Sequence, residues 1–451
     1  MAGIITFGGL ATGLDTNRII DQLVRLERRP IDLLDQQVAA VQATQSSIGT
    51  LQAKLATLRG AAAALRTVDD VLVRQASSSD ETVLGAAAGA GAARGSTTIS
   101  VLQLAHGSVA GSQVGLASAS ATVASGPGTF QFQVGGGDVH QVAVDATTTL
   151  QDLAGAINDA NAGVTAAAVN VGTAASPDFR LVLQSTASGA SSTITILQDD
   201  TSLAVQTTQA GQNAKFTVQG FSATFERESN SFSDVLPGVT FTAKAVGTAT
   251  VTVDDDTKAI VEKARALATA FNDIVTFVAG QSNIQESADK NALDVGSLAT
   301  DITARRIVDR LHTVFSEVLA GATGAKVNLS SLGFATQRDG TILFDEGKFT
   351  AALASDAAGT AQVFAGNGVG AGIANDLATL IDGLSGAGGT LTTHSSALSD
   401  QLHLLQDQID TSQRAVDTFE QGLREQFNAL ESFVNGLQSQ SQFLSQLFTG
   451  R

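Results

Sequence analysis

The chain has 451 residues, no Cys, Trp or Tyr, and a formal net charge of −17 from 43 acidic and 26 basic residues. This charge argues against nucleic acid or anionic lipid as the main partner, because both favour a basic surface. The missing Cys excludes disulfides and thiolate metal sites. At roughly 100–200 residues per domain, the length predicts about two to four domains.

The N-terminal segment carries no recognisable secretion signal. It has neither a basic stretch nor a continuous apolar run, and no part of the chain reaches the ~18 apolar residues of a membrane helix. No membrane insertion is therefore expected. The protein is expected in the cytoplasm, or outside the cell after export by a route that needs no cleaved signal.

A long amphipathic helix is predicted from Asp15 onward. Asp15 is suited to cap its first turn, and Pro30 is expected to divide it into two helices. Its apolar residues recur at steps of three and four, and the opposite face is rich in Gln, which is typical of a coiled coil or a helix bundle. The stripe comprises Ile20, Leu23, Leu34, Val38, Val41, Ile48, Leu55 and Leu58.

Between about residues 76 and 256, short runs rich in Thr, Val, Ile and Phe alternate with Gly, Ser and Asp, which predicts a β-dominated insert. One helix is expected within it, at 149–161, with Leu150, Leu153, Ala154 and Ile157 on one face. Strands are predicted at 97–104, 128–134, 139–144, 180–184, 193–197, 215–218, 239–243 and 248–253.

Helical periodicity returns after the acidic run Asp254–Asp256, which we interpret as a strand-to-helix turn. Helices are predicted at 260–278 and about 298–319. The runs 334–336 and 341–344 flank a four-residue turn and predict a hairpin. Asp345 is expected to cap a short helix that continues through Leu353.

The C-terminal fifty residues repeat the pattern of the N-terminus. Both terminal stripes are too narrow to bury themselves alone, so they are expected to pair with each other or with other chains. The C-terminal stripe consists of Leu398, Leu402, Leu405, Ile409, Val416, Phe419, Leu423, Phe427, Leu430, Val434, Leu437, Leu444 and Phe448.

No catalytic or cofactor-binding pattern emerges. The run 366–371 matches a dinucleotide fingerprint only in its glycines and lacks a preceding strand, so a loop is expected there. No two of the five His residues have a metal-ligand spacing, and there is no nucleophile elbow. We therefore expect no enzyme activity, no cofactor and no metal site.

Several stretches in the expected order resemble the bacterial flagellar hook-associated protein 2 family, the filament cap proteins. Each stretch is weak alone, and together they span nearly the whole chain. One departure is that the C-terminal helix of this family is often Met-rich with a Tyr near its end, whereas apolar residues of other types stand here. The stretches are Gly8–Asp15 with 19–23 and 27–30; Thr149–Asn158 with Gly163–Ala166 and Arg180–Leu183, similar to the IN repeat; Arg227–Asn230 with Asp234–Phe241; and Ser331–Gly333 with Gly340–Asp345.

The resemblance implies a structural cap at the distal tip of the flagellar filament, outside the cell, which promotes folding and insertion of exported flagellin and prevents its loss. It implies a ring of identical subunits, five or six in number. Flagellin, the hook–filament junction protein, an export chaperone and the type III export apparatus are its implied partners. The absence of a cleaved signal and of disulfides suits type III export.

The predicted fold class is α+β multidomain, with a helical leg formed by both chain ends and β-rich domains inserted in the middle. The leg helices are expected to be of low stability and disordered in the free protein. The predicted domains are 1–40 with 405–451 (terminal helices), 41–75 with 257–404 (helical bundle with a hairpin), 76–108 with 213–256 (β-rich), and 109–212 (β-rich with one helix).

Filament and subunit contacts are assigned to the terminal helices. Two alternatives stay open. An extracellular adhesin would use the Thr- and Ser-rich insert 109–212, although sugar sites usually need Trp or Tyr. The second alternative is another axial subunit of the flagellum, either flagellin or the junction protein. The predicted contact residues are Ile19, Ile20, Leu23, Leu34, Leu423, Phe427, Leu430, Val434, Leu437, Leu444 and Phe448.

Overall fold

A computed structural model describes residues 15–286, 293–316, 319–320, 326–367 and 372–449. The segment Gly8–Leu14, which carries part of the family resemblance, and most of the loop predicted at 366–371 lie outside these ranges. The chain forms two compact units. One consists of residues 1–71 and 261–451, and the other of residues 72–260.

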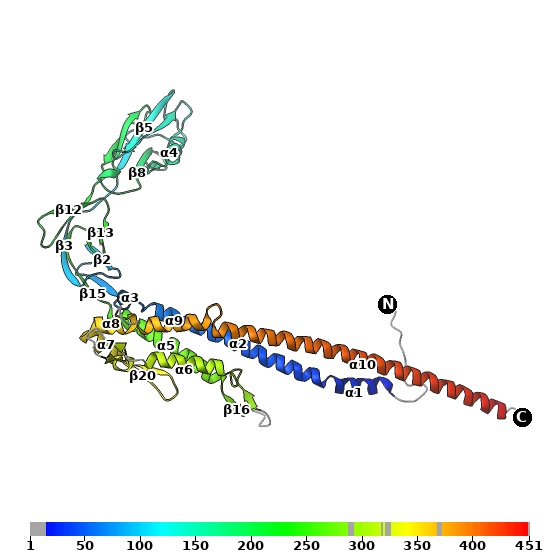
Figure 1. Cartoon of the computed structure of the whole chain (residues 1–451). Coiled ribbons are helices and arrows are strands. Elements are labelled where there is room, and N and C mark those ends of the chain that lie inside the picture. The colour runs from blue at the N-terminus through cyan, green and yellow to red at the C-terminus, as the bar shows by residue number, and fades with distance from the viewer. Residues whose placement is uncertain (1–14, 287–292, 317–318, 321–325, 368–371, 450–451) are drawn as a thin grey trace. The chain divides into compact units, whose positions relative to one another are not determined.

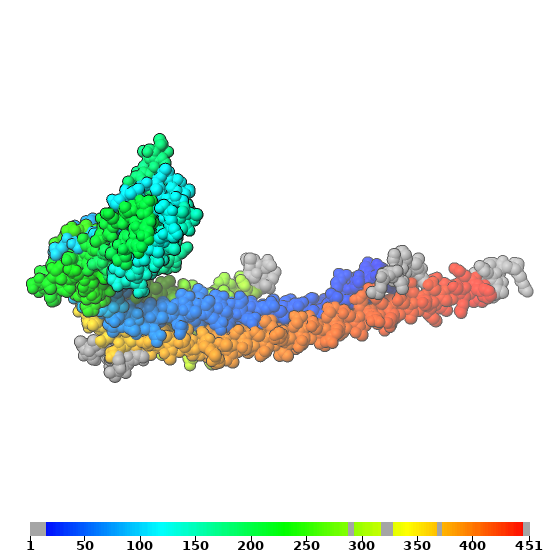
Figure 2. Space-filling model, turned by 90° about the horizontal axis from the view of Figure 1, so that it is seen from above, coloured from blue at the N-terminus to red at the C-terminus, as the bar shows by residue number. Residues whose placement is uncertain are grey.

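The first unit is mainly helical, and the two chain ends meet in it. The predicted division near Pro30 is confirmed: α1 (Thr16–Glu27) ends just before α2 (Arg29–Ala63), with Pro30 in the first turn of α2. The Oδ1 atom of Asp15 accepts a hydrogen bond from the Arg18 N–H and caps α1. The C-terminal helix α10 (Thr390–Thr449) runs beside α2 and α1 (Figures 1 and 2).

A small apolar core holds the two ends together. Ile20, Val24 and Ile31 of the N-terminal helices are buried against Val416 of α10. Ile409, Leu423 and Phe427 of α10 are partly buried against the same cluster. Hereafter this set of residues is called the leg core. Pairing of the two terminal stripes therefore occurs within one chain.

Apart from α3 (Val68–Val71), which precedes the β insert, the remaining helices and hairpins of this unit follow it. The predicted hairpin 334–344 and the Asp345 cap are both confirmed. The expected helix 298–319 is shorter, because the Asp301 side chain caps the chain just before Ile302. The elements are α3 (Val68–Val71), α5 (Thr257–Gln281), β16 (Ile284–Glu286), β17 (Leu293–Val295), α6 (Ile302–Ser316), β18 (Leu319–Ala320), β19 (Lys326–Val327), β20 (Phe334–Thr336), β21 (Ile342–Phe344), α7 (Glu346–Ser355), α8 (Ala357–Ala365) and α9 (Ile373–Ser385).

The second unit consists of antiparallel sheets with the strand orders β1-β15-β3-β11-β12, β13-β14-β2, β10-β4-β8-β7 and β6-β5-β9. Its strands are β1 (Arg74–Ser78), β2 (Leu84–Ala88), β3 (Gly95–Gln103), β4 (Val109–Ser112), β5 (Gly128–Val134), β6 (Val139–Val144), β7 (Val164–Asn170), β8 (Phe179–Ser185), β9 (Ile194–Asp199), β10 (Val205–Gln209), β11 (Ala214–Val218), β12 (Thr224–Arg227), β13 (Ser231–Leu236), β14 (Val239–Ala243) and β15 (Gly247–Asp255).

Two separate cores stabilise the second unit. In the first, Phe216 stacks on Phe232 with ring centroids 4.3 Å apart. The second core surrounds the buried Phe130 and Phe132 of β5 and includes the apolar face of α4 (Leu150–Asp159). The run Asp254–Asp256 is the predicted turn, because β15 ends in it and Asp256 accepts a hydrogen bond from the Ala259 N–H of α5.

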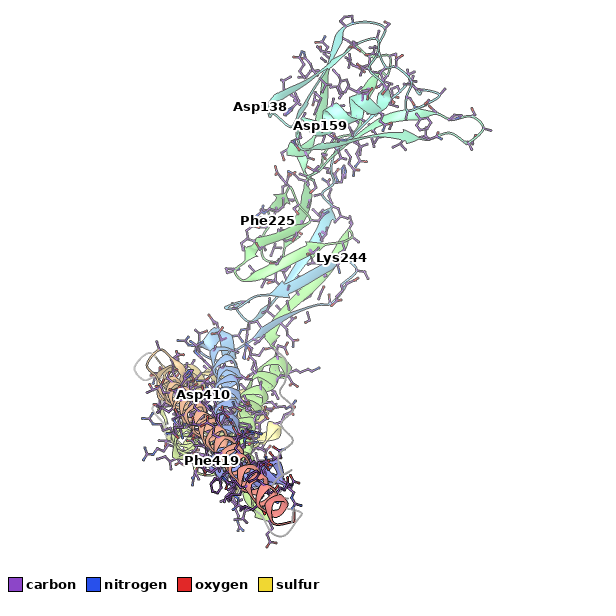
Figure 3. The ribbon with its side chains drawn as sticks, turned by 90° about the vertical axis from the view of Figure 1, so that its right-hand side faces the viewer. Asp138, Asp159, Phe225, Lys244, Asp410 and Phe419 are labelled. Carbon is purple, nitrogen blue, oxygen red and sulfur yellow. The ribbon has the colours of Figure 1, made fainter. Side chains whose placement is uncertain are left out.

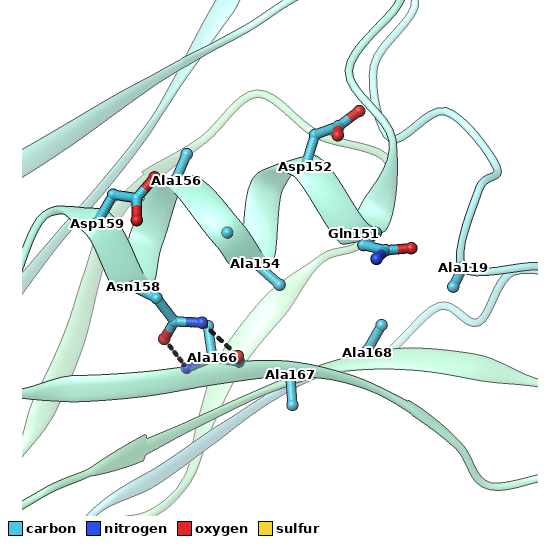
Figure 4. A pocket seen from close by; sticks show the side chains of 11 residues that line it. Ala119, Gln151, Asp152, Ala154, Ala156, Asn158, Asp159, Ala166, Ala167 and Ala168 are labelled. Atoms are coloured by element: carbon cyan, nitrogen blue, oxygen red, sulfur yellow. Dashed lines mark hydrogen bonds between the residues drawn. The ribbon is translucent and has the colours of Figure 1, made fainter. Parts of the chain in front are cut away.

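The helix α4 carries the Ile157–Asn158 pair of the IN-like repeat. Thr149 and Asp152 form a capping box at its start, and Ile157 is fully buried. The Asn158 side chain forms hydrogen bonds with both backbone groups of Ala166 in β7 (Figure 4). Its Nδ2 atom donates to the carbonyl oxygen at 2.9 Å, and its Oδ1 atom accepts from the N–H at 2.7 Å. Asn158 thus occupies the place of a neighbouring strand at that point of β7.

Two of the predicted domain limits lie in the helical part of the chain. The limits at 40/41 and 404/405 fall inside α2 and α10, which continue through them without a break. The fold class is confirmed as α+β, with a helical leg from both chain ends and β-rich parts between them. The four-domain division itself stays a prediction.

Candidate partner-binding surface of the terminal helices

The predicted contact residues fall into two groups. Ile20, Leu423 and Phe427 belong to the leg core, so their side chains are wholly or partly used within the chain. Ile19, Leu34 and Val434 are half-buried, whereas Leu23, Leu430, Leu437 and Leu444 are exposed. Phe448 lies in α10, and its side chain is outside the described set.

The C-terminal part of α10 concentrates the exposed group. Beyond the leg core, α10 continues past α1 (Figure 1). Leu430, Leu437 and Leu444 recur there every seventh residue and therefore lie on one side of the helix. Isolated exposed leucines are normal on a protein surface, but a row of them on a single helix marks an interaction site.

Further apolar residues strengthen this surface, although the sequence-based contact set did not include them. Phe433 and Phe443 are each 65% exposed on α10. Leu26 and Leu33 are exposed on the N-terminal helices. The seven-residue spacing from Leu26 to Leu33 was a signal in the sequence that could have revealed a second stripe.

Charge divides α10 into two sections. Up to Glu431 the helix is rich in ionic and polar side chains, among them an ion pair between Arg424 and Glu420 at 2.8 Å. Asp410 and Phe419 lie along this section (Figure 3). From residue 432 to 449 no charged residue occurs. The terminal section therefore presents apolar side chains among Ser, Gln and Asn. Burial of these uncharged side chains at an interface costs less free energy than burial of charged ones.

Within the described residues, no three His, Asp or Glu side chains gather where a metal ion could be held. Across the same residues, no helix is both long and apolar enough to cross a bilayer. The exposed apolar surface of the terminal helices is therefore a candidate binding surface.

Family comparisons agree with the architecture. The model of the flagellar hook-associated protein 2 C-terminus matches residues 211–439, and that of its N-terminus matches residues 12–108. The flagellin hook IN motif matches residues 129–187. The C-terminal model alone matches about half of the chain, and the two hook-associated protein models lie on either side of the IN match.

Individual relatives cover the chain almost end to end. The flagellar hook-associated protein 2 of Escherichia coli K12 is 27% identical over 99% of this chain and 98% of its own length. The B-type protein of Pseudomonas aeruginosa PAO1 is 27% identical over 94% of both chains.

Among solved structures, the D1-D2-D3 domains of the flagellar cap protein FliD from Escherichia coli superpose with a TM-score of 0.65. They share 26% identity and cover 78% of this chain and 99% of that structure. The order of the family matches along the chain thus agrees with the helical leg and the β-rich insert of the structure. The chain belongs to the flagellar hook-associated protein 2 family and is a cap protein of the bacterial flagellar filament.

Proposed function

We propose that this chain caps the filament tip as a ring of identical subunits and that the uncharged end of α10 holds the ring to the filament. The cap lies outside the cell, promotes folding and insertion of exported flagellin, and prevents its loss. Its action is mechanical and steric rather than catalytic, so no enzyme activity is part of the proposal. The observation that carries it is the exposed apolar row of α10 beyond the leg core.

The division of α10 into a packed section and an exposed section suits a cap that must move. A contact with the filament has to break and form again as each flagellin is added. Leu430, Phe433 and Leu437 can make such a contact without unfolding the leg, because the leg core near Val416 is separate from them. The predicted contact set of the terminal helices is kept in this proposal, with Phe433 and Phe443 added.

Further partners are included in the proposal: flagellin, the hook–filament junction protein, an export chaperone and the type III export apparatus. Family membership alone supports these. The two alternatives have less support. The IN motif is shared with flagellins, but the matches to the hook-associated protein 2 models favour the cap over another axial subunit. No observation favours adhesion.

The test is complementation of a strain in which this gene is deleted. The variant carries Phe433→Ser, Leu437→Ser, Phe443→Ser and Leu444→Ser together. We expect short or missing filaments and flagellin monomers in the medium, with normal thermal unfolding of the purified chain. Leu404→Ser is the matched control, because Leu404 is also an exposed leucine of α10, at 63%, but lies in its charged section.

Normal filaments from the fourfold variant would show that this surface does not hold the cap. Normal filaments from the deletion strain itself would contradict the cap function. The two results differ, so the role of the surface and the role of the protein are tested separately.

A further inference from the structure

We propose that the β16–β17 hairpin of one copy docks on the α1–α2 junction of a neighbouring copy. This inference rests on the proposed function, because it requires an assembly of this chain. Each copy would then use two different surfaces, and such a head-to-tail contact closes into a ring when its rotation fits. Two exposed apolar surfaces of one helical unit, flanked by opposite charges, carry the argument.

The first surface is one face of the hairpin. Ile284 pairs with Val295 and Glu286 pairs with Leu293, and because side chains alternate along a strand these four lie on the same face. All four are exposed. A hairpin of two strands is marginal in water unless its apolar face packs against something. This face, hereafter the hairpin face, therefore needs a cover.

The second surface lies where α1 meets α2. Leu26 and Leu33 are seven residues apart, so they lie on the same side of the helices, and their exposed fractions are 54% and 59%. Ile20, Val24 and Ile31 point to the leg core instead. Leu26 and Leu33 thus form a second stripe, hereafter the junction stripe, on a side that α10 does not cover.

Glu286 on the hairpin face and Arg29 on the junction stripe carry opposite charges, and the exposed acids Glu27 and Asp32 also lie beside the stripe. Glu286 belongs to the hairpin face and is exposed. Arg29 lies three residues after Leu26 and four before Leu33, which places an exposed guanidinium on the junction stripe. Arg25, one residue before Leu26, is also exposed. Apolar contact in the middle with an ion pair at the edge is the usual composition of a protein interface.

The two surfaces are displaced from each other along the leg. Ser297, just after β17, accepts a hydrogen bond at its carbonyl oxygen from Thr44 Oγ1 of α2 at 2.9 Å, and its hydroxyl lies 2.7 Å from that of Ser47. Leu33 precedes Thr44 by eleven residues, or about 16 Å of helix. The hairpin lies at the end of α6 nearer to α1 (Figure 1). A neighbouring copy shifted along the leg by roughly this distance would bring its hairpin beside the junction stripe.

Site-directed disulfide formation tests this contact without background, because the chain has no Cys. Full-length Leu33→Cys and Leu293→Cys chains are mixed in equal amounts, oxidised under conditions in which the unaltered chain sediments as an oligomer, and run on a non-reducing gel. We expect a heterodimer from the mixture and a ladder from the double variant. A disulfide needs Cα atoms within about 7 Å, so a random encounter gives little product.

The matched control pairs Leu293→Cys with Leu404→Cys, an equally exposed leucine of another helix. A second measurement reverses charges: Glu286→Arg and Arg29→Glu should each lower the fraction of oligomer at low salt, and the variant carrying both should restore it. All four positions are exposed, so the variants are expected to fold, which thermal unfolding checks.

Equal yields from Leu33→Cys and Leu404→Cys, or no rescue in the double charge reversal, would overturn the contact. Protection of Leu293→Cys from a thiol reagent on intact filaments, without a product with Leu33→Cys, would mean that another partner covers the hairpin face. Both results leave the cap function intact. Failure of the unaltered gene to restore filaments in the deletion strain would instead overturn the proposed function.

Discussion

His394 and Asp301 join the start of α6 to α10: the Nε2 atom of His394 lies 2.7 Å from Oδ2 of Asp301. The other carboxylate oxygen of Asp301 accepts hydrogen bonds from the N–H groups of Thr303 and Ala304 and so caps α6. The Asp301 side chain is only 5% exposed. One buried carboxylate therefore satisfies a helix start and fixes the body of the helical unit to the leg helix.

Replacement of Asp301 by Ala is expected to lower the free energy of unfolding of the helical unit by about 2–4 kcal/mol. Loss of a helix cap costs roughly 1 kcal/mol, and loss of a buried hydrogen bond to a charged group costs about 1.5–3 kcal/mol. Urea unfolding followed by circular dichroism measures the change. Asp301→Asn is the control, because its oxygen retains the cap. Equal losses for both variants would show that the cap is not important.

Asn158→Ala is expected to destabilise the β-rich unit by about 1–3 kcal/mol, because the buried Ala166 backbone would lose a donor and an acceptor partner together (Figure 4). Thermal unfolding of the full chain, followed by near-ultraviolet signals of Phe, detects the loss. Gln151→Ala, which removes an exposed amide side chain from the same helix, serves as the control. No difference between the two variants would remove the structural role assigned to Asn158.

Val416→Ala is expected to lower the free energy of unfolding of the leg by about 1–3 kcal/mol. Val416 is 2% exposed and packs against Ile20, Val24 and Ile31. Hydrogen exchange of the amides of α1 should become faster. Phe433→Ala on the same helix removes a larger but exposed side chain and should change exchange in α1 very little. Rapid exchange throughout α1 in the unaltered chain would instead support the prediction that these helices are disordered in the free protein.

His312 predicts a pH dependence of the helical unit. Burial lowers the pKa of His312 below its ordinary value of 6.5, and a smaller opposing effect comes from Asp309. The unfolded chain therefore binds a proton at a higher pH than the folded chain. Burial of the neutral His312 side chain contributes to the free energy of unfolding. This contribution is fully present above about pH 6.5 and is lost as the pH falls from there towards the lower pKa of the folded chain.

The corresponding measurement compares urea unfolding of the unaltered chain and of His312→Gln at several pH values between about 7.5 and 5. The difference in stability between the two should shrink as the pH falls, because Gln cannot take up the proton. His403→Gln is the control, since His403 is exposed on α10. A difference that stays constant with pH would contradict the burial of a neutral His312.

Much of the secondary structure could be predicted because its signals are local. The division of the N-terminal helix at Pro30, the hairpin 334–344 with its Asp345 cap, and the turn at Asp254–Asp256 follow from a few neighbouring residues. The strand pattern missed β1, β2, β4, β7, β10, β12 and β13 of the insert, and β2 and β10 show why. The sequence of β2 is largely Gly and Ala, and most residues of β10 are polar and exposed, so neither shows the alternation of a half-buried strand.

The sequence by itself determined the amphipathic helices at both ends, the β-rich insert between them and, through the ordered motifs, the family. The tertiary structure decided which apolar faces stay uncovered. Ile20 and Leu26 look alike in a helical pattern, yet Ile20 meets Val416 while Leu26 faces outward. The physical reason is that helix formation depends on neighbouring residues, whereas burial depends on a partner from the opposite end of the chain.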